Sequence, residues 1–284
     1  FDPKVQQAVN RIQSVEETRE VIDAAREAGF KSVSVDLIYG LPHQSVDSIK
    51  PTLETVLSLN PDRLALYHYA HLPHLFKPQR RIDTDSVPNS EEKLDILQYA
   101  VQTLTDKGYV FIGMDHFAKP QDDLAIALRE GWLQRNFQGY STYADSDLLA
   151  IGVSSIGKIG STYEQNEKDI EAYYQALDEG RLPIMRGYQL NQDDLLRRNI
   201  IQDLMCRFAL DFGVYEQAFN WQFEQYFQTE IADLQKLAAL GLLMLQCHGL
   251  KVTPKGRFLI RNIAMVFDYH LRYRETQATY SKTV

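Results

Sequence analysis

The residue in this sequence best placed to do chemistry is a single carboxylate. Asp36 lies within residues 32–38, Ser-Val-Ser-Val-Asp-Leu-Ile, whose other members are apolar or small. A carboxylate in such a segment costs desolvation unless it is paired or hydrogen-bonded, and perturbed carboxylates gather at functional sites. Asp36 is therefore either a functional residue or a buried aspartate satisfied by the backbone or a lysine, and the pattern leaves both open.

Three histidines at a spacing of three suggest a second kind of chemistry, metal binding. His68, His71 and His74 carry imidazoles, which are common zinc ligands. Positions three apart on a strand point to opposite faces, Pro73 interrupts the segment, and no carboxylate or cysteine is spaced to complete a site. We therefore interpret His68 and His71 as polar groups that line a cleft, and we predict no metal site in this chain.

Two further patterns carry weaker signals. Asp115-His116 follows an expected strand and is either a general acid–base pair or a structural pair that caps the next helix. The glycine–aromatic segments 136–140 and 152–157 would let backbone approach a flat ligand closely. No dinucleotide, phosphate-loop, nucleophile-elbow or zinc-protease motif is present, so those enzyme classes find no support.

The elements that position Asp36 form a strand–helix–strand unit. The pattern predicts a helix over 15–28, which starts at the capping-box pair Ser14 and Glu17, then a strand over 32–38, a helix over 46–59 and a strand over 63–70. Strands joined through a helix pair in parallel, in a barrel or in an open sheet. Asp36 shares its face with serines, which favours a barrel lumen, with the site at the carboxyl ends of the strands.

The rest of the chain predicts a change to mostly helical structure near residue 188. Residues 74–88 are expected to be loop and 131–160 ordered loop with short strands, with a helix over 90–107, a strand over 109–113 and a helix over 121–130. Helices over 193–208 and 228–240, a hairpin over 242–252 and a helix that starts at Thr253-Pro254 suggest a winged-helix-like unit. We expect three domains, 1–107, 108–187 and 188–284.

Composition narrows the class of protein. The 284 residues include 30 basic and 38 acidic side chains without a dense basic run, which argues against binding of nucleic acid. No stretch of about 18 apolar residues predicts a membrane helix. The two cysteines, Cys206 and Cys247, form neither a disulfide framework nor a CxxC site, and a cytoplasmic location is expected.

Several segments together resemble a known family. They are Val9-Asn10-Arg11, Val35 to Pro42, Tyr69 to Pro73, Gly113 to Ala118, Arg135 to Tyr140, Gly152 to Ile156 and Thr253 to Asn262. In this order and at these spacings they closely resemble the bacterial oxygen-independent coproporphyrinogen III oxidases, radical S-adenosylmethionine enzymes of haem synthesis. The resemblance runs over almost the whole chain.

The resemblance implies an α/β fold, part of a (β/α)6 radical S-adenosylmethionine barrel followed by a mostly helical, winged-helix-like domain. In that family a CxxxCxxC loop holds a [4Fe–4S] cluster and two S-adenosylmethionine molecules lie beside it. The loop is absent here, and the chain opens with Phe1-Asp2-Pro3. We therefore expect a C-terminal fragment that holds no cluster and is inactive by itself.

Site residues follow from the same resemblance. Arg11 and Asp36 are implied to bind S-adenosylmethionine, as is the backbone near Ala70, and Ile156 is implied to contact the cluster-bound molecule. Arginine suits a methionyl carboxylate as a fixed fork of donors, and a carboxylate suits an amino or sulfonium group. Phe137 and Gln138 are implied to line the second cofactor or the substrate.

The implied reaction is the oxidative decarboxylation of two propionates of coproporphyrinogen III to vinyl groups, which gives protoporphyrinogen IX by a 5′-deoxyadenosyl radical. The substrate carries four carboxylates, which makes Arg80, Arg81, Lys77 and Arg135 candidates to hold it, against the alternative of solvated loop charges. An electron donor and an electron acceptor are required. We expect a full-length monomer, whereas the open barrel edge of a fragment favours self-association.

Two other functions remain open. Relatives of this enzyme traffic haem, so the chain is alternatively a haem chaperone without oxidase activity; residues 136–140 favour the oxidase. The C-terminal half alone would suggest a non-catalytic winged-helix binding module, but the chain is acidic and has no basic recognition helix.

Overall fold

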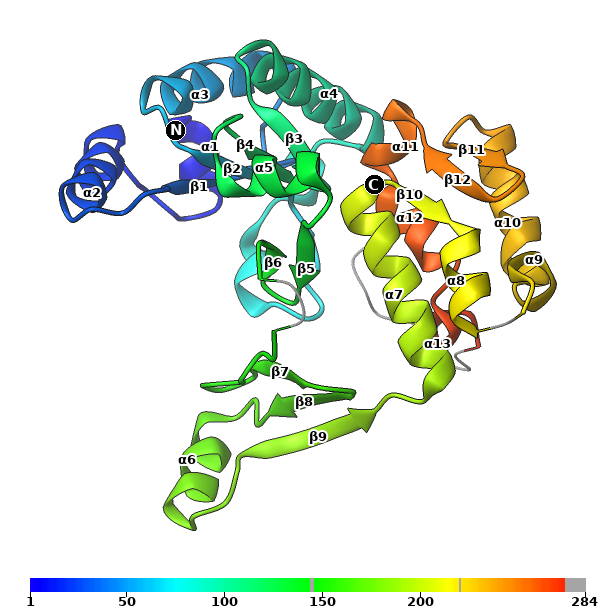
Figure 1. Cartoon of the computed structure of the whole chain (residues 1–284). Helices are drawn as coiled ribbons and strands as arrows, with labels where there is room; N and C mark the ends of the chain where they lie inside the picture. Colours follow the sequence, from blue (N-terminus) through cyan, green and yellow to red (C-terminus); the bar gives the residue numbers. More distant parts are fainter. Residues whose placement is uncertain (144–145, 220, 274–284) are drawn as a thin grey trace. The chain divides into compact units, whose positions relative to one another are not determined.

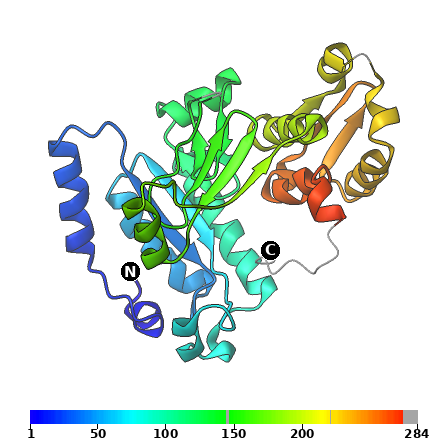
Figure 2. The ribbon, with the colours of Figure 1, turned by 90° about the horizontal axis from the view of Figure 1, so that it is seen from below.

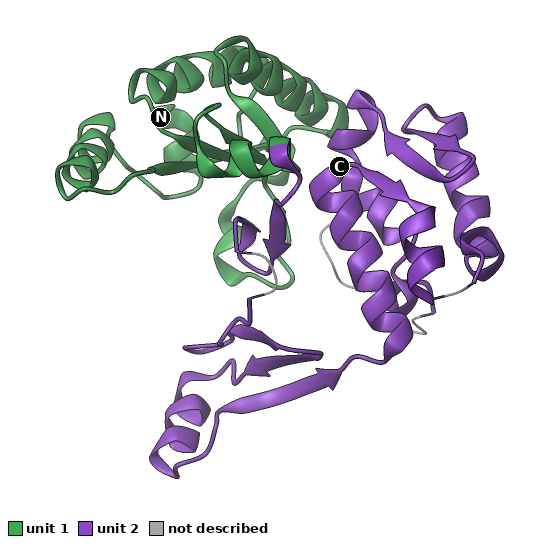
Figure 3. Ribbon diagram, in the orientation of Figure 1, with its two compact units in different colours: residues 1–129, 278–284 green, residues 130–277 purple. Residues whose placement is uncertain are grey.

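The computed structural model describes residues 1–143, 146–219 and 221–273. These residues form two compact units, 1–129 and 130–273 (Figure 3). The sequence suggested a boundary after residue 107, but the strands that follow it pair into the sheet of the first unit. The boundary expected at 188 lies inside the second unit.

The first unit begins with the predicted strand–helix–strand arrangement. Its elements are α1 (Pro3–Ala8), α2 (Val15–Glu27), β1 (Ser34–Tyr39), α3 (Val46–Ser58) and β2 (Arg63–His68). β1 and β2 pair in parallel from Ser34↔Arg63 to Tyr39↔His68. The capping box of Ser14 and Glu17 is present, with both reciprocal hydrogen bonds. The predicted helices and the parallel pair are confirmed.

The sheet then continues with two antiparallel strands, of which the sequence predicted the first, over 109–113, but not the second. Short 3₁₀ turns cover Lys77–Arg81 and Thr84–Ser86, and they are followed by α4 (Ser90–Asp106), β3 (Val110–Gly113), β4 (His116–Ala118) and α5 (Asp123–Glu130). The strand order is β1-β2-β4-β3, with β4 antiparallel to both neighbours. Asp115 and His116 therefore lie in a hairpin, and the alternative that they cap the next helix is wrong.

One face of this sheet carries the core of the unit. α3 and α4 cover it (Figures 1 and 2), and their buried side chains pack against those of the strands: Ile49, Leu53, Val56, Leu64, Leu66, Ile96 and Leu104. On β1, Val35 and Leu37 pack against this core, whereas Ser34, Asp36 and Ile38 are exposed. Because Asp36 is exposed, the alternative of a buried aspartate satisfied within the protein is wrong.

The second unit begins with small sheets. β5 (Gln134–Asn136) and β6 (Gly139–Ser141) form a hairpin over the first glycine–aromatic segment. β7 (Ile156–Ile159), β8 (Thr162–Asn166) and β9 (Ile184–Gln189) form an antiparallel sheet in that order, with α6 (Ile170–Asp178) between β8 and β9 along the chain. The predicted mixture of loop and short strands over 131–160 is confirmed.

The remainder of the second unit is mostly helical. It comprises α7 (Gln192–Arg207), β10 (Ala209–Asp211), α8 (Phe212–Phe219), α9 (Phe223–Tyr226), α10 (Gln228–Ala239), β11 (Leu243–Gln246), β12 (Gly249–Val252), α11 (Pro254–Phe258), α12 (Ile260–Met265) and α13 (Tyr269–Arg272). The predicted hairpin is β11 and β12, and β10 extends it into a three-stranded sheet. Thr253 caps α11, with Pro254 in the first turn, as predicted.

Aromatic side chains form the centre of this helical part. Phe212 and Phe223 stack with ring centroids 4.1 Å apart, and Phe227 and Phe267 pack edge to face at 5.4 Å. All four are buried. In the part of the chain that is described, we find no helix whose length and apolar character would let it cross a membrane.

Candidate cofactor-binding site

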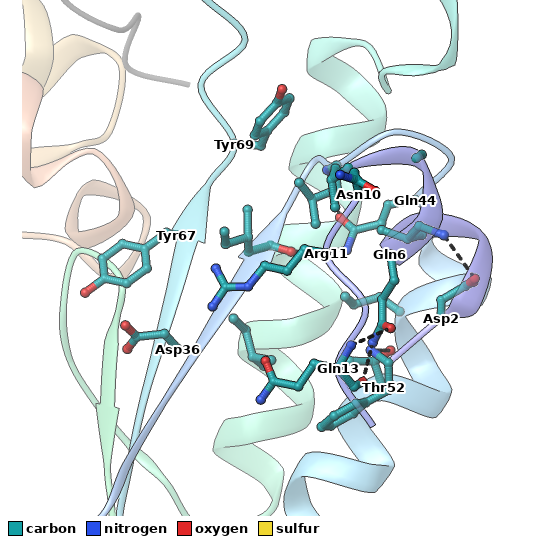
Figure 4. A pocket seen from close by; sticks show the side chains of 18 of the residues that line it. Asp2, Gln6, Asn10, Arg11, Gln13, Asp36, Gln44, Thr52, Tyr67 and Tyr69 are labelled. Carbon is teal, nitrogen blue, oxygen red and sulfur yellow. Dashed lines mark hydrogen bonds between the residues drawn. The ribbon is translucent and has the colours of Figure 1, made fainter. Parts of the chain in front are cut away.

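A cavity of about 700 Å³ opens in the first unit beside the edge strand β1, and Asp36 is among the residues that line it (Figure 4). Its size is ordinary for a small-molecule site. The residues that line it come from α1 and the loop after it, α2, β1 and the loop after it, α3, β2 and the turn around Gln79. The polar or aromatic side chains among them include Gln6, Asn10, Arg11, Asp36, Gln44, Tyr67, Tyr69 and Arg81.

The loop that carries Arg11 is held in place by local hydrogen bonds. Asp2 caps α1 by accepting from the backbone N–H of Lys4 at 2.8 Å, and Asn10 ends the helix in the left-handed region at φ 53°. The side chain of Gln6 donates to the carbonyl of Gln13 at 2.8 Å and accepts from its N–H at 3.1 Å. The backbone of Arg11 is therefore part of a fixed loop, and its guanidinium extends from this loop toward the sheet (Figure 4).

Asp36 and Tyr67 approach the cavity from adjacent strands. Ile38 and Tyr67 are partners in the parallel register, so Tyr67 shares its face of the sheet with Ile38 and Asp36. The ring of Tyr67 meets His116 edge to face at 6.0 Å, and the hydroxyl of Tyr69 lies 3.2 Å from Nδ1 of His71. A carboxylate and two phenol rings thus border one cavity.

The chain that leaves β1 is also fixed. Gly40 has φ 80°, a conformation that side chains with a Cβ rarely adopt, and the aliphatic part of Lys93 lies 3.1 Å from where its Cβ would be. Gln44 accepts from the N–H of Leu41 at 3.0 Å and donates to the carbonyl of Ile38 at 3.1 Å. The carboxyl end of β1 is therefore held by hydrogen bonds from its own sequence neighbourhood.

The histidines lie outside the lining of this cavity. Burial, together with the charge of Lys93, lowers the pKa of His68, and the ring of His68 packs against Tyr39 at 5.4 Å. His71 bonds Tyr69, and its Nε2 has no hydrogen-bond partner among the described residues. Neither imidazole lines the cavity, so the interpretation of both as cleft-lining groups is wrong for this cavity.

The remaining predicted residues are divided between two places. Arg81 lines the cavity, whereas Arg80 donates to the carbonyl of Pro73 at 3.0 Å. Ala70 lies beside the lining residue Tyr69, and its carbonyl accepts from Gln79 at 3.0 Å. Lys77 starts the 3₁₀ turn and lies outside the lining.

The second unit holds another cavity, of about 880 Å³, lined by Arg135, Phe137 and Gln138. Ile156 lies on β7 opposite Gln165, outside the lining of this cavity. The structure thus brings Arg11 and Asp36 together in one cavity and Arg135, Phe137 and Gln138 together in the other.

The residues of this chain do not fit a [4Fe–4S] cluster. Among the residues described, no group of three or more His, Cys, Asp or Glu side chains could hold a metal ion. Of the two cysteines, Cys247 is exposed, whereas burial raises the pKa of the Cys206 thiol to about 12. A cluster needs several thiolates around it, and these two side chains cannot supply them.

Comparison with known proteins agrees with the geometry. The model of the radical SAM superfamily matches residues 1–56, and that of the HemN C-terminal domain matches residues 190–259. An oxygen-independent coproporphyrinogen III oxidase of Thermostichus vulcanus is 48% identical over 285 residues, which cover all of this chain and 87% of that protein. The chain belongs to the oxygen-independent coproporphyrinogen III oxidase family.

Other members of the family are longer. The oxidase of Synechocystis sp. is 48% identical and that of Escherichia coli 47% identical, and each match covers all of this chain and 62% of the relative. The solved structure described as "Coproporphyrinogen III oxidase (HemN) from Escherichia coli is a Radical SAM enzyme" superimposes with a TM-score of 0.92 at 49% identity, over 95% of this chain and 62% of that one. The chain thus spans about three fifths of the length of these relatives, and its predicted fold class is confirmed.

The superfamily implies S-adenosylmethionine, and the first cavity fits that group. Neither the guanidinium of Arg11 nor the carboxylate of Asp36 has a hydrogen bond or ion pair with another described residue, so both are available to a ligand. Arg11 suits the methionyl carboxylate, and Asp36 suits the amino or sulfonium group. Tyr67 and Tyr69 offer flat surfaces for adenine.

Sequence reasoning missed Tyr67, Gln44 and Gln6. Tyrosine is common in strands, so Tyr67 gave no signal by its type, although the parallel register of two predicted strands would have placed it beside Ile38. Gln44 and Gln6 act through backbone hydrogen bonds that depend on local loop geometry.

Proposed function

We propose that this chain forms part of an oxygen-independent coproporphyrinogen III oxidase and that its first unit binds S-adenosylmethionine. The observation that carries the proposal is that Arg11 and Asp36 line the same cavity. Neither side chain has a hydrogen bond or ion pair with another described residue. The family supports the same reaction, since its curated members carry that name. We place the protein in the cytoplasm.

The proposed substrate is coproporphyrinogen III, with two of its propionates converted to vinyl groups. Each conversion releases one CO₂, one proton and two electrons, so the complete enzyme requires an electron acceptor, and an electron donor to start the chemistry. Bound S-adenosylmethionine would supply the radical that takes a hydrogen atom from the β-carbon of the propionate. The residues of this chain do not fit the iron–sulfur cluster.

The residues of this chain act by binding and orientation. The fork of donors on Arg11 would hold the methionyl carboxylate, and its rigid loop would fix that end of the molecule. Asp36, on β1, would bind the amino group of the same molecule. Holding both ends of the methionyl group on fixed elements limits the orientations of the reactive part.

Four further residues are proposed to contact a cofactor or the substrate. Phe137 and Gln138 line the second cavity and would contact a second S-adenosylmethionine or the substrate. Ala70 would contribute its backbone and Ile156 its apolar side chain. Ala70 is not among the residues that line the first cavity, and Ile156 is not among those that line the second.

Binding and activity test the proposal separately. Titration calorimetry of this chain with S-adenosylmethionine should show at least about tenfold weaker binding for Arg11→Ala and for Asp36→Asn, since each removes a charge-assisted contact. Arg19→Ala and Asp95→Asn change exposed residues outside the lining and are the matched controls. Equal binding by all four variants would remove the site assignment.

The activity arm uses the full-length gene product. Anaerobic assay with reconstituted cluster, dithionite, S-adenosylmethionine and coproporphyrinogen III should give protoporphyrinogen IX, and both cavity variants should lose this activity. If S-adenosylmethionine is never cleaved but haem binds with visible absorbance, the haem chaperone replaces the oxidase as the function.

A further inference from the structure

The cavity of the second unit is built by two hairpins and a helix. Tyr140 on β6 donates to the carbonyl of Met205 on α7 at 3.0 Å, and Gln202 on α7 donates to Gln134 on β5 at 2.8 Å, so the β5–β6 hairpin is fixed to α7. Phe137, in the turn of that hairpin, meets Tyr163 on β8 edge to face at 5.3 Å. Elements far apart in the sequence thus enclose one space.

Three cations line this cavity, one from each of three elements. They are Arg135 on β5, Lys158 on β7 and Arg198 on α7, and all three are half-buried. None has a carboxylate partner among the described residues. The guanidinium carbon of Arg135 lies 5.6 Å from the ring centroid of Tyr140, and Arg198 donates to the carbonyl of Gly160 at 3.4 Å.

Acidic side chains are fewer than basic ones in the lining of this cavity. Asp147 is the acidic residue among those that line the cavity, and it already accepts from the N–H of Gly160 at 2.8 Å. The whole chain carries a formal charge of −8, so a cavity with this excess of cations runs against the general composition. Half-buried cations without counter-charges are costly unless a ligand supplies the negative charge.

The walls between the cations are flat and aromatic. Phe137, Tyr140, Tyr143 and Tyr163 all line the same space. Aromatic faces favour a planar, conjugated ligand, and cations on three separate elements suit several carboxylates spread around a ring better than one compact anion.

We infer that the second cavity binds the carboxylate side chains of a tetrapyrrole through Arg135, Lys158 and Arg198, with the macrocycle against the aromatic walls. This inference rests on the proposed function for its ligand class. It assigns a role to Lys158 and Arg198, to which the sequence analysis gave none, and it gives Arg135 a defined role as one of three carboxylate-binding cations.

The test is equilibrium binding of coproporphyrin III, the stable oxidised porphyrin, to this chain, followed by its Soret absorbance and fluorescence. Arg135→Gln, Lys158→Met and Arg198→Gln should each raise the Kd about tenfold, as expected when one charge-assisted contact is lost. Lys251→Met removes an exposed lysine of the same unit outside the cavity and should leave the Kd unchanged. Lys158→Arg and Arg198→Lys keep the charge and should retain most of the binding.

A ligand series provides a second measurement that does not depend on any variant. Mesoporphyrin IX has a similar macrocycle with two carboxylates in place of four, and it should bind at least about tenfold more weakly than coproporphyrin III to the unchanged chain. Binding of coproporphyrin III should also weaken with added salt, because charge attraction contributes to it.

Three results would overturn the inference: no binding of coproporphyrin III by the unchanged chain, equal binding by the neutralised variants, or loss of S-adenosylmethionine binding in those variants with porphyrin binding intact. The last would assign the cations to a cofactor. None of these measurements needs turnover. The inference can therefore fail while the oxidase proposal stands, and the full-length assay can fail while porphyrin binding is confirmed.

Discussion

Nη1 of Arg197 on α7 lies 2.8 Å from Oε1 of Glu230 on α10, and their side chains are only 12% and 7% exposed. Arg197 also donates to Asp193 at 2.7 Å, and its guanidinium lies 5.0 Å from the ring of Phe227. A single arginine thus connects two helices and the aromatic centre of the second unit. Glu230 is the more buried of the two carboxylate partners of Arg197, so removing it takes away part of the compensation of a buried charge, which is destabilising.

We therefore expect Glu230→Ala to lower the free energy of unfolding of the second unit by about 3 kcal/mol. Both tryptophans, Trp132 and Trp221, lie in this unit, so urea unfolding followed by their fluorescence reports it. Glu224→Ala changes an exposed glutamate nearby and should cost less than about 0.5 kcal/mol. A loss of the same size in both variants would contradict the role of the buried pair.

Gly256, in the first helix after the β11–β12 hairpin, has no room for a side chain. A Cβ there would lie 1.8 Å from the carbonyl oxygen of Leu242, whose backbone cannot move without disturbing β11. We expect Gly256→Ala to cost about 3 kcal/mol of stability, at the upper end for overpacking. Gly180→Ala is the control: Gly180 has φ 71° but open space around it, so the change should cost only about 1 kcal/mol. The same urea experiment measures both, and equal costs would show that crowding is not the cause.

The sequence predicted those parts of the fold whose signals are local. The capping box at Ser14 and Glu17, the alternation in β1 and the Thr253-Pro254 start of α11 depend on near neighbours, and each is present. β4 was not predicted because three residues, His116–Ala118, are too few to show a period. Its pairing with β2 arises from contacts distant in sequence.

The same distinction applies to the sites. Arg11 and Asp36 were found by family resemblance, and the fold brings them to one cavity. Lys158 and Arg198 were missed, because a lone lysine on a strand and a lone arginine on a helix have the pattern of solvated charges. Lys158 and Arg198 line the same cavity as Arg135 because two hairpins pack against α7. The spacing of residues along the sequence does not predict this packing.

Asp194, near the start of α7, predicts a specific dependence of stability on pH. Burial alone raises the pKa of this carboxyl group, but hydrogen bonds from the N–H of Asn191, from His270 at 2.7 Å and from Tyr188 at 3.2 Å outweigh it and lower the pKa below its usual value. A carboxyl group with a lowered pKa in the folded chain stabilises the fold above its unfolded pKa. That stabilisation is lost as the pH falls through the folded value.

We expect Asp194→Asn to cost about 2 kcal/mol at neutral pH, since it weakens several hydrogen bonds to a charged group. The difference from the unchanged chain should shrink as the pH falls below about 4. Urea unfolding across this range measures it, with the exposed Asp178→Asn as control. A cost that stays constant with pH would mean that the charge of Asp194 does not contribute.

The two cysteines should differ sharply in reactivity. Cys247 is exposed, whereas Cys206 is buried in α7 and burial raises its pKa to about 12. At about pH 8, a thiol with that pKa is a thiolate only about one part in ten thousand, and the thiolate is the reactive form. We expect Ellman's reagent to modify one thiol per folded chain rapidly and the second only after urea is added. Cys247→Ser should abolish the rapid phase, and Cys206→Ser should leave it unchanged. Rapid modification of two thiols in the folded chain would mean that α7 opens readily, and the same opening would then expose Arg197 and Arg198 on that helix.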